Sequence, residues 1–246
     1  MSVNKLYKTV RAEDAALFTL SFLWICVIIH SVFMPLPDGD AAASADGETA
    51  PVLILDPGHG GADGGAVAPD GTPESALNLS VSLRIRDLCA FLGVDTVMTR
   101  ESEELAYPAE AKTIAAMKKW DTRRRVEIAE SVDSPVFLSI HQNIYPSSGP
   151  HGSQVLYAQN EPSRALAELI QSRLTAALLP ENRRVPVPAG KNIYIMSHVQ
   201  CTAVLVECGF LSHPQELSLL QSADYQKKIA SVLTACYLQF TEKGVL

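Results

Sequence analysis

The sequence is short of positive charge and of cysteine. Its 246 residues carry 20 Lys and Arg against 27 Asp and Glu, and this balance argues against a nucleic-acid-binding protein, which presents a basic face. The five cysteines include no C-x-x-C pair, so neither a disulfide scaffold nor a cysteine-ligated zinc knuckle is expected. Glycine (14) and proline (15) are at ordinary levels, which excludes collagen-like and low-complexity chains.

Two common catalytic motifs are also missing. No G-x-S-x-G elbow occurs, so a serine hydrolase of that type is not expected. The glycine-rich run Gly58–Gly65 lacks the Lys and the Ser or Thr of a phosphate-binding P-loop. With 47% apolar and 19% charged residues, the chain has enough hydrophobic side chains for a packed core.

The longest hydrophobic run lies near the N-terminus. Residues 15–34 contain no charge and, at 1.5 Å per helical residue, reach about 30 Å, the thickness of the hydrocarbon core of a bilayer. Basic residues precede this run, and the next one along the chain is Arg84. The positive-inside rule therefore predicts a cytoplasmic N-terminus (1–14), a transmembrane signal anchor (15–34) and a catalytic domain outside the cytoplasm.

The anchor has two alternatives. A signal peptide cleaved near Ala43–Ala45, where small residues offer an A-x-A-like site, would leave the protein secreted. A buried core helix is the other alternative, which the length of the run disfavours. Residues 35–50 are small, acidic and contain Pro and Gly, so they are interpreted as a linker, and 51–242 as the catalytic domain.

After the linker, short β-branched runs alternate with amphipathic stretches. This pattern predicts an α/β fold with a largely parallel sheet flanked by helices. Helices are expected at Ser75–Leu92, Ala109–Lys119, Asp121–Ser131, Pro162–Leu178, Pro214–Leu220 and Tyr225–Phe240. Strands are expected at Val52–Leu55, Asp95–Thr99, Pro135–Ile140, Gly152–Ala158, Ile193–Met196 and Ala203–Val206, and a loop at Arg183–Gly190.

Three of these strands end in residues that bind metals or protons. His59 follows the first strand after a tight turn, His141 ends another strand, and Glu207 ends a third. Because functional groups of such sheets gather at the carboxyl ends of the strands, we expect these three side chains on one rim. Glu74 begins the helix after the glycine-rich loop and is expected to point back at that rim.

Two imidazoles and one carboxylate are the ligand set of a catalytic zinc with one open position. A second carboxylate, not bound to the metal, would serve as the base for the attacking water. The chemistry alone leaves open which of Glu74 and Glu207 takes which role.

The motifs around these residues resemble those of the zinc-dependent N-acetylmuramoyl-L-alanine amidases (amidase type 3). Residues Asp56–Ala66 (DPGHGGADGGA) resemble the first motif, and Glu74 with Asn78 resembles the second. Residues Ser139–Asn143 (SIHQN) resemble the third, and Val206–Ser212 (VECGFLS) the fourth. The resemblance extends from about Val52 to Phe240.

The resemblance implies a role for each residue. The metal ligands would be His59, Glu74 and His141 around Zn²⁺, and Glu207 would be the catalytic carboxylate. The implied fold is a twisted six-stranded sheet flanked by helices. The implied reaction hydrolyses the amide between N-acetylmuramic acid and L-alanine in peptidoglycan, and the short chain resembles the spore-cortex amidases of this family.

Several points stay open at this stage. A zinc peptidase acting within the stem peptide, or a catalytically silent envelope binding module, is the alternative function. We expect Asp56 or the side chain of Asn143 to orient a ligating imidazole. His213 is interpreted as a plain loop histidine, with a position lining the cleft as the alternative. Peptidoglycan and the bacterial membrane are the expected partners, nucleic acid is not, and the need for a protein activator is left open.

Overall fold

The computed structural model describes residues 50–242. The predicted cytoplasmic segment (1–14), the predicted signal anchor (15–34) and nearly all of the predicted linker (35–50) lie outside the described residues. Within 50–242, no helix combines the length and the hydropathy needed to cross a bilayer.

One six-stranded sheet organises the described residues. Its strands are β1 (Val52–Pro57), β2 (Thr96–Met98), β3 (Pro135–Asn143), β4 (Gln154–Tyr157), β5 (Val187–Pro188) and β6 (Thr202–Phe210). The spatial order is β2-β1-β3-β6-β4-β5, and all pairs are parallel except β4 with β6. The prediction of a largely parallel six-stranded sheet is therefore confirmed.

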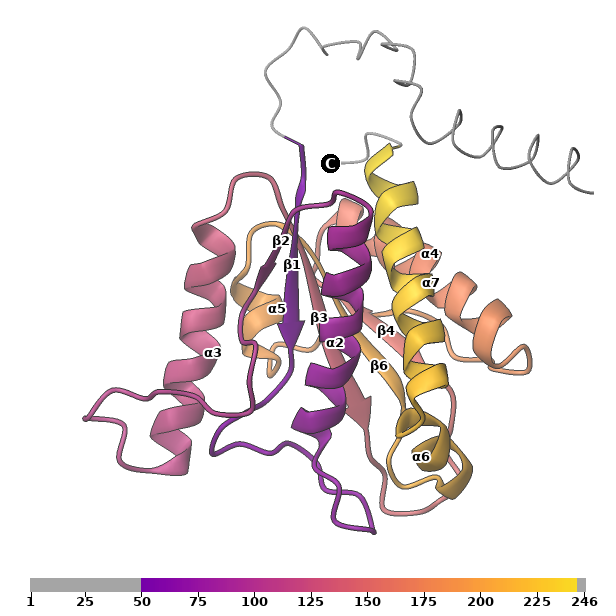
Figure 1. Ribbon diagram of the computed structural model, residues 1–246, viewed down its shortest axis with the longest axis horizontal. Coiled ribbons are helices and arrows are strands. Elements are labelled where there is room, and N and C mark those ends of the chain that lie inside the picture. The colour runs from indigo at the N-terminus through magenta and orange to yellow at the C-terminus, as the bar shows by residue number, and fades with distance from the viewer. Residues whose placement is uncertain (1–49, 243–246) are drawn as a thin grey trace, which may run out of the picture. The chain divides into compact units, whose positions relative to one another are not determined.

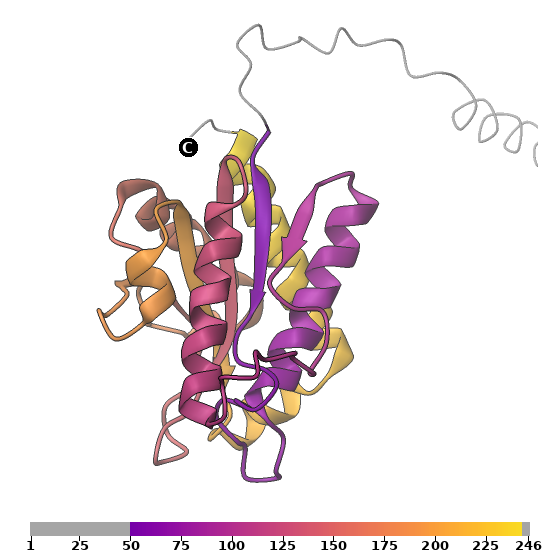
Figure 2. The same ribbon diagram turned by 90° about the vertical axis from the view of Figure 1, so that its left-hand side faces the viewer.

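Helices cover both faces of this sheet. They are α2 (Glu74–Phe91), α3 (Ile114–Glu130), α4 (Glu161–Leu178), α5 (Tyr194–His198), α6 (Pro214–Leu220) and α7 (Ala223–Glu242). Helices α2, α4 and α7 pack on one face, whereas α3 and α5 cover the other (Figures 1 and 2).

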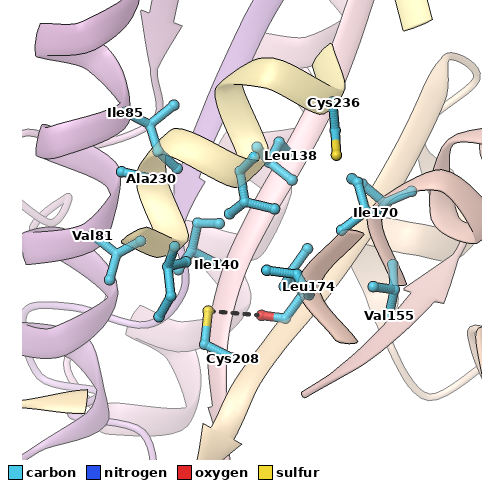
Figure 3. Packing of buried hydrophobic residues seen from close by; sticks show 14 of the residues in the cluster. Val81, Ile85, Leu138, Ile140, Val155, Ile170, Leu174, Cys208, Ala230 and Cys236 are labelled. Carbon is cyan, nitrogen blue, oxygen red and sulfur yellow. Dashed lines mark hydrogen bonds between the residues drawn. The ribbon is translucent and has the colours of Figure 1, made fainter. Parts of the chain in front are cut away.

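The core follows from the alternation of side chains along the central strands. Leu138 and Ile140 of β3 face α2 and α7, where they pack against Val81 and Ile85 (Figure 3). Phe137, the residue before Leu138, points to the opposite face of the sheet, toward α3 and α5. Each fully buried side chain of this size contributes about 1.5–3 kcal/mol to stability, so burial on both faces fixes the register of β3.

Two local predictions are wrong. Residues Ile193–Met196, predicted as a strand, lie mostly in helix α5, and the sixth strand is instead β5, within the segment predicted as a loop. A short apolar run is compatible with either structure, and here the tertiary contacts decide. The two helices predicted at Ala109–Lys119 and Asp121–Ser131 form the single helix α3, which begins after Thr113, whose side chain accepts a hydrogen bond from the backbone N–H of Ala116.

Candidate active site

The carboxyl ends of β1, β3 and β6 meet at one edge of the sheet, the lower edge in Figure 1. His59 follows β1, His141 lies near the end of β3, and Glu207 pairs with His141 in the register of β3 and β6. Glu74 is the first residue of α2, which begins at the same edge. The predicted convergence of these four residues is confirmed.

Glu74 lies between the two imidazoles. Its Oε1 atom is 2.9 Å from Nδ1 of His141, and its Oε2 atom is 3.3 Å from Nε2 of His59. One ligand atom from each of these three residues lies within 4.8 Å of the other two. They form a candidate metal site, with a donor set of two nitrogens and one oxygen that suits zinc.

The carboxylate of Glu74 is held in place by the backbone around it. Oε2 accepts a hydrogen bond from the N–H of Ala66 (2.9 Å), and Oε1 accepts one from the N–H of Gln142 (3.1 Å). Burial raises the pKa of Glu74, but the hydrogen bonds with His141 and His59 outweigh it and keep this pKa well below its usual range. Glu74 is therefore ionised, which is the state in which a carboxylate can bind a metal ion.

His59 is oriented by Asp63, a residue that the sequence analysis missed. Nδ1 of His59 lies 2.9 Å from Oδ2 of Asp63, and Nζ of Lys118 lies 2.9 Å from the same oxygen. Burial lowers the pKa of His59, but the hydrogen bonds with Asp63 and Glu74 raise it to about 9. Because Nδ1 is engaged by Asp63, Nε2 is the nitrogen that faces Glu74.

Asp56 has a different role from the predicted one. Its carboxylate accepts hydrogen bonds from Arg125 Nη1 (2.6 Å), Ser139 Oγ (2.6 Å) and Thr99 Oγ1 (2.7 Å), not from an imidazole. Burial raises its pKa, but Arg125 and the two hydroxyls bring it below the usual value. Among the described residues, Asn143 also makes no side-chain hydrogen bond to an imidazole. The prediction that Asp56 or Asn143 orients a ligand is therefore wrong.

Arg125 links Asp56 to the loop that carries His59 through hydrogen bonds. Its guanidinium donates to the carbonyl oxygens of Pro57 (2.7 Å) and His59 (2.6 Å). His59 has a φ of 60°, a left-handed conformation that a residue with a side chain adopts rarely. The buried arginine thus stabilises an unfavourable backbone conformation that the candidate site requires.

Gly58 leaves room for His141. A Cβ atom at Gly58 would lie 2.2 Å from Nε2 of His141, closer than any van der Waals contact. The imidazole therefore lies against the bare backbone of the loop after β1, and a side chain at this position would displace it.

Glu207 differs from Glu74 in its surroundings. It projects from β6 beside His141, and its Oε2 atom is buried without a hydrogen-bond partner in the described part of the chain. Burial raises its pKa, the nearby His141 lowers it and the charge of Glu74 raises it, and the net result is a pKa of about 7. A carboxyl group with this pKa accepts and returns a proton readily near neutral pH.

Three other residues with reactive side chains are engaged in helix capping or in packing. His213 caps helix α6, where its Nδ1 accepts a hydrogen bond from the N–H of Glu216 (3.3 Å). The ring of His198 stacks on Tyr194 at 3.8 Å. Burial raises the pKa of Cys208, the neighbour of Glu207, to about 12, so this thiol is not a nucleophile near neutral pH.

Comparisons with known proteins agree with this geometry. Residues 53–236 match the family model described as N-acetylmuramoyl-L-alanine amidase. The germination-specific N-acetylmuramoyl-L-alanine amidase of Bacillus subtilis (strain 168) is 38% identical over 198 residues, which cover 78% of this chain and 81% of that protein. The amidase LytC of the same organism is 32% identical over 190 residues, which cover 76% of this chain but 34% of LytC.

A solved structure supports the same assignment. The CwlD amidase from Clostridioides difficile, in complex with the GerS lipoprotein, superimposes with a TM-score of 0.75 at 31% sequence identity. The match covers 79% of this chain and all of that one (100%). The chain therefore belongs to the N-acetylmuramoyl-L-alanine amidase family and hydrolyses the amide bond between N-acetylmuramic acid and L-alanine in peptidoglycan.

Proposed function

We propose that this amidase is zinc-dependent, with His59, Glu74 and His141 as the metal ligands and Glu207 as the catalytic acid and base. The observation that carries the proposal is the meeting of two imidazoles and an ionised carboxylate within 4.8 Å, beside a second carboxylate that none of them binds. When bound there, zinc would polarise the attacking water and the carbonyl of the scissile amide.

The division of labour between the two glutamates rests on their surroundings. Glu74 is ionised and fixed by backbone N–H groups, which suits a permanent ligand. Glu207 has a buried oxygen without a partner and a pKa of about 7, which suits a group that takes up and releases a proton. These surroundings support Glu74 as the metal ligand and Glu207 as the acid and base.

Glu207 would act twice in one turnover. It accepts the proton of the water as the water attacks the lactyl carbonyl. It then donates that proton to the nitrogen of L-alanine, because an amide nitrogen leaves as an amine and not as an anion. The Asp63 carboxylate engages Nδ1 of His59, which would leave Nε2 free to hold the metal, and Arg125 keeps the backbone of His59 in place.

Zinc dependence is tested by removing and restoring the metal. The purified chain is expected to contain about one zinc per molecule, to lose activity on peptidoglycan after chelation, and to regain it with zinc. The variant His141→Ala should neither retain zinc nor recover. Full activity in a metal-free preparation would contradict the proposal.

The spore cortex is the proposed substrate form. The chain aligns with most of the germination-specific amidase of B. subtilis, but with only about a third of LytC. The experiment is a side-by-side digestion of purified spore cortex and vegetative wall. A faster release of L-alanine amino termini from cortex supports the assignment, whereas equal rates contradict it.

The proposed location is outside the cytoplasm, held at the membrane by residues 15–34. The support is the uncharged length of this segment and the basic residues before it. Membrane fractions washed with alkaline carbonate should retain the full chain, and protease added to intact protoplasts should digest the catalytic domain. A short soluble form beginning near Ala43–Ala45 would instead show cleavage. The GerS complex of the C. difficile amidase makes a lipoprotein partner a further candidate to test.

A further inference from the structure

A row of polar side chains crosses three strands at the catalytic edge. His141 of β3 pairs with Glu207 of β6, and Glu207 pairs with Gln154 of β4. Paired residues on adjacent strands project from the same face of a sheet. Ser139 of β3 and Leu205 of β6 each lie two residues earlier on the strand and share this face. It is the face that α3 and α5 cover. The row therefore leads sideways from the candidate zinc site along one face.

Arg184 continues this row beyond β4. Its Nη1 atom donates to Oε1 of Gln154 (3.0 Å), and its Nε atom donates to the carbonyl oxygen of His151 (2.9 Å). Its guanidinium carbon lies 4.5 Å from the centroid of the Phe210 ring. The half-buried guanidinium is thus fixed by two hydrogen bonds and an aromatic face.

A register shift explains why Phe210 is available to Arg184. His141 of β3 pairs with Glu207 of β6. Asn143 lies two residues after His141, but its partner Phe210 lies three residues after Glu207, so β6 has one extra residue here. This bulge places Phe210 on the same face as Glu207. The aromatic ring under Arg184 is therefore a consequence of the irregularity next to the catalytic edge.

The guanidinium retains capacity for a ligand. Nη2 of Arg184 has no hydrogen-bond partner within residues 50–242, and no described carboxylate lies within 4.0 Å of Arg183 or Arg184. Both arginines line a hollow of about 430 Å³ whose wall consists of residues 149–151 and 181–184. In a chain of net charge -7, this hollow carries two arginines and a histidine against one glutamate.

We propose that Arg184 binds a carboxylate of the stem peptide and selects substrates that carry one. The inference rests on the proposed function, because the scissile amide must lie at Glu207. Adjacent strands are about 4.8 Å apart, and an extended peptide advances about 3.3 Å per residue. A peptide that leaves Glu207 along the row therefore reaches Arg184 within a few residues. A guanidinium fork matches a carboxylate with two parallel hydrogen bonds.

The test uses two matched substrates. Muramoyl peptides of one sequence, ending in a carboxylate or in an amide, are hydrolysed by the zinc-loaded full chain. We expect kcat/KM to favour the carboxylate at least about tenfold, which is the effect of one charged hydrogen bond. Arg184→Gln should abolish this preference and Arg184→Lys should keep part of it. The control Arg173→Gln removes the same charge from the exposed side of α4 and should keep the preference.

A purely structural role for Arg184 gives a different result. If Arg184 only holds the loop of His151, Arg184→Gln slows both substrates by one factor and the preference remains, which overturns the proposal. Absence of the preference in the wild type overturns it too. Calorimetric binding of the two released peptides makes the same comparison without turnover. Carboxylate-selective binding that is lost in Arg184→Gln therefore supports this proposal even if hydrolysis fails, and failure of hydrolysis alone counts against the proposed function.

Discussion

Nη2 of Arg125 lies 2.6 Å from the carbonyl oxygen of His59, so a buried guanidinium holds the backbone of a residue whose imidazole faces Glu74. The same arginine binds Asp56, which is fully buried. The Asp56–Arg125 ion pair therefore contributes both to the fold and to the candidate zinc site. A substitution that removes it is expected to affect both.

Replacing Arg125 tests this coupling. Arg125→Met leaves the Asp56 carboxylate buried without its cation, so the free energy of unfolding should fall by about 3–5 kcal/mol. Urea denaturation of the metal-free chain measures this change. Arg123→Gln, a nearby exposed position on α3, is the control and should change stability by less than about 0.5 kcal/mol. Equal stabilities of the two variants would show that the ion pair does not stabilise the fold.

Removing the carboxylate behind His59 should weaken metal binding. Asp63→Ala deprives Nδ1 of His59 of its hydrogen-bond acceptor, and zinc affinity is expected to fall about 10–100-fold. Competition with a zinc chelator measures the affinity. Asp70→Asn, an exposed aspartate of the same loop, is the control. Unchanged affinity in Asp63→Ala would mean that His59 needs no orienting partner.

A methyl group at Gly58 should act on the other imidazole. In Gly58→Ala the new Cβ collides with the ring of His141, so we expect zinc affinity to fall at least about tenfold. Gly149→Ala places a Cβ in open space and serves as the matched control. If Gly58→Ala binds zinc as tightly as the wild type, the close approach of the ring to this loop is not required.

The buried Glu207 predicts a pH dependence of the metal-free chain. Its pKa is about 7 in the folded state and about 4.5 in the unfolded state, so the folded state binds the extra proton between these values. Its contribution to stability is therefore full below about pH 4.5 and is lost as the pH rises through 7.

The variant Glu207→Gln isolates this effect because it cannot ionise. The difference in unfolding free energy between variant and wild type should grow in favour of the variant from pH 4.5 to 7, by about 1.4 kcal/mol for each unit of pKa shift. Urea denaturation across this range measures it. A difference that does not change with pH would show that Glu207 has an ordinary pKa.

Much of this site follows from sequence, because it depends on strand ends. The positions of His59, His141 and Glu207 after apolar runs suffice to bring them to one edge of a parallel sheet. The contacts that orient them do not follow so directly. Asp63 lies four residues after His59 in a glycine-rich loop, where the backbone has positive φ at His59, Gly60 and Gly61, and this turn brings the two side chains together.

The features that the sequence did not predict depend on long-range contacts or on very short elements. Arg125 lies 66 residues from His59 in the chain, and nothing in its helical pattern indicates that it binds a loop carbonyl. The two-residue strand β5 carries too little pattern to be recognised, and the five-residue helix α5 is too short to show a helical period. Sequence periodicity predicts long elements, whereas packing against the sheet decides these short ones.

The most direct test of the account compares the full chain with Glu207→Gln on purified peptidoglycan, both loaded with zinc. The wild type should expose new L-alanine amino termini, and the variant should bind zinc equally well but expose them at least about 100-fold more slowly. Full turnover by the variant, or new amino termini elsewhere in the stem peptide, would contradict the account.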